Sequence, residues 1–247
     1  MTSNRSLADF EQRSVRHLEE VADRYMTPMR YQDCYWHFPN RRVALSAQDV
    51  SHLLRNCSRS STQDPNDYRI NNFRQHYQVD ASQDIERLPI EEVLRNYFRR
   101  LDRLFFFNLI GRQIRDANGQ VRPLISLQVK DITNAEARGS FIQGNSTIQV
   151  YTREDDGRRS YLQSLIGTMA HEMVHAYLAV FSDELDDRYD RWVSANQNHG
   201  EMFWEINAYI LDKLVFWLNG AGLLEADRNQ AHQELRQARR QARFAPR

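Results

Sequence analysis

The segment from Leu162 to Val180 constrains the fold most, because Glu172 is its only formally charged residue. Apolar residues recur in it at helical spacing and form one stripe, whose members are Leu162, Ile166, Met169 and Met173. Burying a carboxylate costs free energy unless the group has a partner or a chemical task. The segment therefore predicts a buried helix over about residues 160–180 with a specific role for its charged residue.

The polar face of this predicted helix carries His171 and His175, nearly opposite the apolar stripe. Residues four apart lie about 5–6 Å from each other at Cβ, so both imidazoles can reach one metal ion at about 2.0–2.1 Å. Glu172 points about 100° round the helix, where it can act as general base on a metal-bound water. The H-E-x-x-H pattern therefore predicts a catalytic zinc site. The alternative is two core histidines bonded to backbone carbonyls.

A hydrolytic zinc site needs a third protein ligand and one open position. No histidine lies between Ala176 and Leu185, and the next one is His199. It stands at the start of a predicted helix whose apolar face contains Phe203, Ile206, Tyr209 and Ile210. The pattern favours His199 as the third ligand, with Glu201 and Glu205 as alternatives because carboxylates also bind zinc.

The rest of the chain predicts a mixture of helices and short strands. Helical spacing predicts helices over about residues 5–25, after Ser46, from Pro89 to about 105 and over about 200–218. Short alternating runs predict strands over 124–129, 139–142 and 146–151. The order of helix, small sheet, helix and helix is typical of an α+β fold.

Composition along the chain suggests three regions. Residues 59–84 are rich in Ser, Asn, Gln and Asp and predict a long polar connection. We place a boundary near Pro89, which gives a helical and polar N-terminal extension over 1–89 and a main domain over 90–220. Residues 221–247 form an Arg-rich tail, in which we expect the stretch 228–243 to be a solvated helix or a frayed end.

The charge balance limits the partners that the chain can have. It has 33 basic and 33 acidic residues, so it lacks the global positive field of many nucleic-acid-binding proteins. No apolar run has the length of a signal peptide at the N-terminus or of a membrane span. We therefore expect an intracellular protein with no membrane partner, and leave the nucleus and the cytoplasm open.

Two cysteines, Cys34 and Cys57, are too few for a disulfide scaffold. Together with His37 and His52 they supply four residues of metal-ligand type, so a second, structural zinc is one interpretation. Their unusual order and aromatic neighbours favour ordinary packing instead.

Two motifs of the chain resemble those of the SprT-like (Spartan-related) family of zincin metallopeptidases. They are His171-Glu172-Met173-Val174-His175-Ala176 and Asn198-His199-Gly200-Glu201-Met202-Phe203. In that family the zinc helix is followed by an H-G-x-x-F segment whose histidine is the third ligand, which maps onto His199. The resemblance covers about residues 90–220. It implies a zincin-like domain that hydrolyses peptide bonds of a protein or peptide substrate.

The chain departs from the family pattern in three ways. The interval between His175 and His199 is longer and contains an acidic segment over 183–190, expected to be a solvated loop or to tune access to the cleft. No cysteine follows the motif, so the C-terminal zinc module of several relatives is lacking. Residues 1–89 have no counterpart in the family.

Alternative interpretations remain for the whole chain and for one strand. The chain could be a catalytically inactive, zinc-stabilised interaction module, or a chromatin- or DNA-associated protein that uses its Arg-rich tail. The predicted strand over 146–151 is either a plain half-buried strand or an edge strand that holds an extended peptide by β-augmentation.

Overall fold

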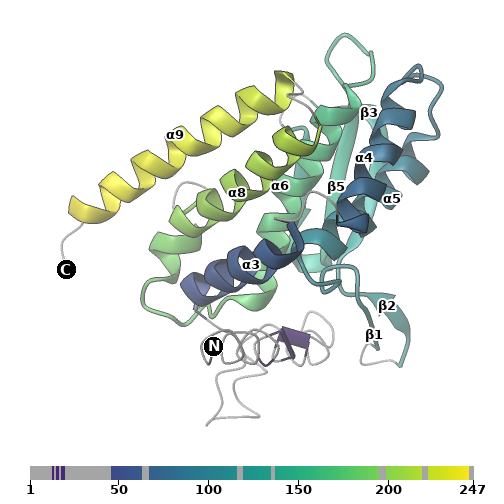
Figure 1. Cartoon of the computed structure of the whole chain (residues 1–247). Coiled ribbons are helices and arrows are strands. Elements are labelled where there is room, and N and C mark those ends of the chain that lie inside the picture. Colours follow the sequence, from purple (N-terminus) through teal and green to yellow (C-terminus); the bar gives the residue numbers. More distant parts are fainter. Residues whose placement is uncertain are drawn as a thin grey trace.

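The computed structural model describes residues 46–62, 67–115, 119–134, 137–194, 199–218 and 222–244, together with residues 13, 15, 16, 18 and 19. These five single residues are helical, and the rest of the helix predicted over 5–25 lies outside the described residues. The fold is α+β, as predicted, with helices around a small sheet (Figure 1).

The helix predicted after Ser46 is α3 (Ala47–Thr62). Ser46 caps it, because its hydroxyl oxygen accepts from the Asp49 backbone N–H at 3.1 Å and its O–H donates to the Asp49 carboxylate at 2.7 Å. Val50 and Leu54 on its inner face are fully buried. The cap and the apolar spacing therefore fix where this helix begins and which face it buries.

The polar connection predicted over residues 59–84 is wrong, because α4 (Tyr68–Ala81) occupies most of it. The helix begins at Asp67, whose carboxylate accepts from the Arg69 N–H at 2.7 Å. Only Ile70 and Phe73 are buried on α4, so its apolar pattern is too sparse to predict a helix. Tertiary packing stabilises it instead: Phe73 meets the Tyr97 ring edge-on at 5.5 Å between centroids.

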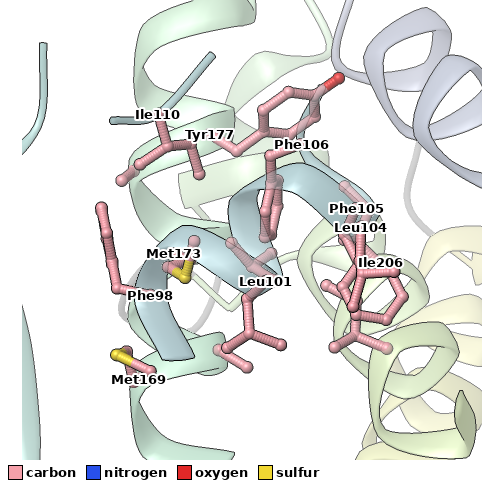
Figure 2. Close-up of a cluster of buried hydrophobic side chains, with 14 of the residues drawn as sticks. Phe98, Leu101, Leu104, Phe105, Phe106, Ile110, Met169, Met173, Tyr177 and Ile206 are labelled. Atoms are coloured by element: carbon pink, nitrogen blue, oxygen red, sulfur yellow. The ribbon is translucent and has the colours of Figure 1, made fainter. Parts of the chain in front are cut away.

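The core forms around α6 (Leu162–Phe181), the predicted buried helix. On one side it meets α5 (Ile90–Phe105), where Phe98 and Leu101 lie near Met169 and Met173 (Figure 2). It also meets α8 (Glu201–Trp217), the predicted final helix, whose Ile206 lies beside Leu104 and Phe105 of α5 (Figure 2). The same hydrophobic cluster contains residues from before and after Pro89, so α3 and α4 share this core.

The larger sheet contains β3 (Ser126–Thr133), β4 (Gly139–Ile142) and β5 (Thr147–Arg153) in the order β3-β5-β4. β5 is parallel to β3 and antiparallel to β4. The edge-strand interpretation of residues 146–151 is therefore wrong, because β5 is paired on both sides and largely buried. Among the described residues, β4 pairs only with β5. A short hairpin, β1 (Gln113–Arg115) and β2 (Val121–Pro123), was not predicted.

The Arg-rich segment forms α9 (Gly222–Phe244), which runs back alongside α8 (Figure 1). Leu224, Ala231 and Leu235 are buried on its inner face. Arg239 binds Glu201 and Glu205 of α8, at 3.4 and 2.9 Å. This segment is a helix with one docked face rather than a frayed end.

Within the described part of the chain, no helix combines the length and the apolar character needed to cross a membrane.

A buried carboxylate holds the turn after α5. Asp102 is 4% exposed and accepts from the backbone N–H groups of Ile110 and Gly111 at 3.0 and 2.8 Å. The turn contains Phe107 and Asn108 in left-handed conformations, with φ of 60° and 59°, which are unfavourable for phenylalanine but tolerated by asparagine. Asp102 therefore keeps a strained turn in place between α5 and the hairpin.

We expect Asp102→Ala to lower the free energy of unfolding at about pH 4 by about 3 kcal/mol, because the buried N–H of Ile110 and the partly buried N–H of Gly111 lose their acceptor. Burial raises the pKa of Asp102 to about 7. The stabilisation that Asp102 gives the folded protein is therefore complete below about pH 4, and it is lost as the pH rises through about 7. Urea unfolding at several pH values checks both points. Asp187→Ala is the control, since that side chain is 92% exposed and its loss should change stability by less than about 0.5 kcal/mol.

Candidate metal centre

The three predicted histidines lie together. His171 and His175 project from successive turns of α6, and His199 directly precedes Gly200, the N-cap of α8. The Nε2 atom of His199 lies 3.1 Å from the Nε2 atoms of both His171 and His175. These three side chains are the one group of potential metal ligands found among the described residues.

The arrangement of the three nitrogens fits a metal ion better than it fits hydrogen bonds. An imidazole nitrogen has either one hydrogen or one lone pair in the ring plane, so His199 Nε2 cannot bond well to both neighbours. A cation between the rings would accept a lone pair from each of them. Tetrahedral coordination with metal–nitrogen distances of about 2.0–2.1 Å places the nitrogens about 3.3 Å apart, close to the observed separations.

Burial keeps two of the imidazoles neutral. Burial, helped by the charge of the neighbouring histidines, lowers the pKa of His171 to about 3 and that of His175 to about 2. A histidine must be neutral to bind a metal through its lone pair. Both side chains are therefore in the ligating state at neutral pH.

Aromatic rings hold the imidazoles in place. Phe203 stacks on His175 at 4.3 Å between ring centroids, and Trp204 stacks on His199 at 5.2 Å. Gly200 lets the start of α8 pack closely against the backbone at Trp192. A Cβ at position 200 would lie 2.3 Å from the Trp192 carbonyl oxygen. The glycine and phenylalanine of the second motif thus have direct structural tasks, whereas Trp204 lies outside that motif and was not predicted.

Glu172 lies beside the histidines and is 6% exposed. Burial raises its pKa to about 7, and a hydrogen bond from the Phe141 backbone N–H in β4 opposes this shift. Gly139 makes the close approach of β4 possible, since a Cβ there would lie 2.7 Å from Thr168 Cγ2 and 3.0 Å from Glu172 Cγ. The strand and the helix therefore place a carboxylate of near-neutral pKa next to the three histidines.

The two alternative ligands are engaged elsewhere. Glu205 forms ion pairs with Arg55 of α3 and Arg239 of α9 and accepts from the Ser51 hydroxyl at 3.2 Å. Glu201 pairs with Arg239 at 3.4 Å. Neither belongs to the histidine group, so His199 is the better third ligand.

The second zinc site considered for the N-terminal region cannot be located. Cys34, His37 and the side chain of Cys57 lie outside the described residues. His52 is exposed and its Nδ1 lies 2.9 Å from the side-chain nitrogen of Asn56, within its own helix. The four-residue interpretation therefore stays a prediction.

A cavity of about 620 Å³ opens at the histidines and Glu172. One of its walls comes from the acidic segment and the residues after it, for which access to the cleft was one expectation, and another comes from α9, which was not predicted as part of a site. Tyr189 lies in the acidic segment over 183–190, and Val193 lies in the π-helical turn over Asp190–Ser194 that overlaps the end of this segment. Asp227 and Gln230 come from α9. The acidic segment is thus not only a solvated loop, because Asp183 is 2% exposed and the adjoining residues border the cavity.

Comparison of the chain with protein-family models, with curated proteins and with solved structures finds no match in any of the three. A function for this chain has to be argued from its own residues and their geometry.

We expect purified wild-type protein to contain about one zinc ion per chain by elemental analysis, and His199→Ala to lose most of it. Glu205→Ala should keep the metal, because Glu205 is bound to arginines. Metal loss in Glu205→Ala with retention in His199→Ala would reverse this assignment.

We expect Gly139→Ala to lower the free energy of unfolding by about 1–3 kcal/mol, because its methyl group would collide with Thr168 and Glu172. Gly144→Ala is the matched control, since a Cβ there meets no atom within 4 Å. Thermal or urea unfolding of both variants makes the comparison, and equal stabilities would contradict the close approach of β4 to α6.

Proposed function

We propose that the chain is a zinc-dependent metallopeptidase of the SprT-like, zincin type. The observation that carries the proposal is the convergence of three imidazole nitrogens, two of them on side chains that burial keeps neutral, beside a buried carboxylate at an open cavity. Three histidines with no cysteine or carboxylate among them form a donor set that suits zinc, and it would be held by His171, His175 and His199.

A zinc ion held there would supply the Lewis acid that polarises the scissile carbonyl and makes a water molecule acidic at neutral pH. The protein supplies the proton transfer. Glu172, with a pKa of about 7 in the absence of metal, accepts the proton as the water attacks and passes it to the leaving amine. The Phe141 N–H holds this carboxylate in place.

The strand β4 offers a place for an extended substrate. Gly139 and Phe141 of β4 line the cavity, and so does Gln143 in the turn that follows the strand. Since β4 pairs only with β5 among the described residues, a peptide strand can add to its other edge. A peptide bound there would lie next to Glu172, which the same strand contacts.

We expect Glu172→Gln to lower peptidase activity at least about 100-fold while zinc content and thermal stability remain close to wild type. The amide keeps the shape of the side chain and cannot accept the proton. Cleavage of an unfolded protein such as casein, followed by mass spectrometry of the fragments, measures the loss.

Glu91→Gln is the control, because Glu91 lies on the exposed side of α5 and pairs only with Arg95 among the described residues. Equal activity of the Glu172→Gln variant would exclude Glu172 as general base. A zinc-loaded wild-type protein that cleaves no substrate would favour the inactive interaction module instead.

A further inference from the structure

Beyond the histidines, the lining of the cavity includes residues of α6, α8 and α9. Gly167 lies four residues before His171, about 6 Å along the helix axis. A Cβ at Gly167 would lie 2.7 Å from Leu224 Cδ2 and 3.7 Å from a carboxylate oxygen of Asp227, both on α9. The inner face of α9 is therefore packed against the end of the cavity.

This end of the cavity contains an unsatisfied hydrogen-bond acceptor. Asn207 of α8 lines the cavity and is 3% exposed, and its Oδ1 atom has no hydrogen-bond partner in the structure. A buried polar atom without a partner is costly, so such an atom at a cavity wall indicates a missing partner. The partner that fits an amide oxygen is a hydrogen-bond donor.

A carboxylate faces the same space. Asp227 is half-buried and forms no hydrogen bond or close ion pair with another described residue. Burial raises its pKa, and the charge of Arg138 lowers it from a distance. Two acceptors, one of them anionic, thus border one end of the cavity, while the buried side chain of Leu211 supplies an apolar wall.

We propose that this end of the cavity, bounded by Gly167, Asn207, Leu211, Asp227 and Gln230, binds the side chain of an arginine or lysine in the peptide substrate. We name it the α9 subsite. A guanidinium or ammonium group offers several donors to the two acceptors, and its methylene stem suits the apolar wall. The inference rests on the proposed peptidase function, because it assigns a side-chain preference to that reaction.

Among the described residues that line the cavity, Arg138 is the one arginine or lysine. Arg138 precedes β4, its side chain is 61% exposed, and it pairs with Glu154 at 3.7 Å. Its charge is partly neutralised by Glu154 and it lies in solvent, whereas Asp227 is half-buried. A cationic side chain is therefore favoured over an anionic one, and the experiment compares the two.

The test measures binding rather than turnover. Hydroxamates of Nα-acetylated arginine, citrulline and glutamate are titrated calorimetrically into the full, zinc-loaded chain, since a hydroxamate group can anchor each probe on zinc. Citrulline keeps the shape of arginine without its charge. We expect the arginine probe to bind about tenfold more tightly than the citrulline probe, as a charge-assisted hydrogen bond to Asp227 would provide.

Variants assign this preference to the subsite. Asp227→Asn should reduce the difference to less than about twofold with citrulline binding unchanged, and Asn207→Leu should weaken arginine binding. Glu225→Gln, an exposed change on the same helix, should keep the preference. Thermal unfolding of each variant shows that it is folded.

The outcomes separate this inference from the proposed function. Citrulline binding with no preference for arginine, or tighter binding of the glutamate probe, overturns the α9 subsite and leaves the metallopeptidase proposal intact. If the protein holds no zinc, or if none of the three hydroxamates binds, the metallopeptidase proposal is overturned and the α9 subsite with it.

Discussion

The burial of α6 is the constraint on which the rest of the structure depends. This helix contacts α5, α8, α9 and the strands β4 and β5, yet it carries two imidazoles and a carboxylate. Such groups are costly in an apolar interior, and each lies against a polar group of a neighbouring element. His199 brings its ring nitrogen to those of His171 and His175, and the Phe141 N–H donates to Glu172. The same packing that makes the core therefore assembles the site.

The parts of the fold that could be predicted are those whose signal is local and dense. The apolar spacing in α5, α6 and α8 was sufficient for these helices, and two short motifs identified the histidines. The helix α4 was missed because its few buried residues depend on packing against α5. The central place of β5 was missed because strand order depends on contacts between distant segments. Asp227 and Asn207 carry no motif, so only the packing of α9 on Gly167 shows that they meet at one cavity.

Glu205 shows how a residue of ligand type can have a structural task instead. Its carboxylate joins three helices, because Arg55 belongs to α3, Arg239 belongs to α9 and Glu205 itself belongs to α8. The side chain is only 14% exposed, so these ion pairs are less screened by solvent than ordinary surface pairs. Segments more than a hundred residues apart in the sequence are thereby held near the helix that begins after His199.

The stacking of Trp204 on His199 links the site to an optical property of the chain. Indole emission responds to the charge and polarity of its immediate surroundings, and here the imidazole that would bind a metal lies against the ring face. Occupancy of the site by different ions would thus change the fluorescence of one identifiable tryptophan. The fold would then contain its own spectroscopic reporter of the candidate metal centre, without any added dye.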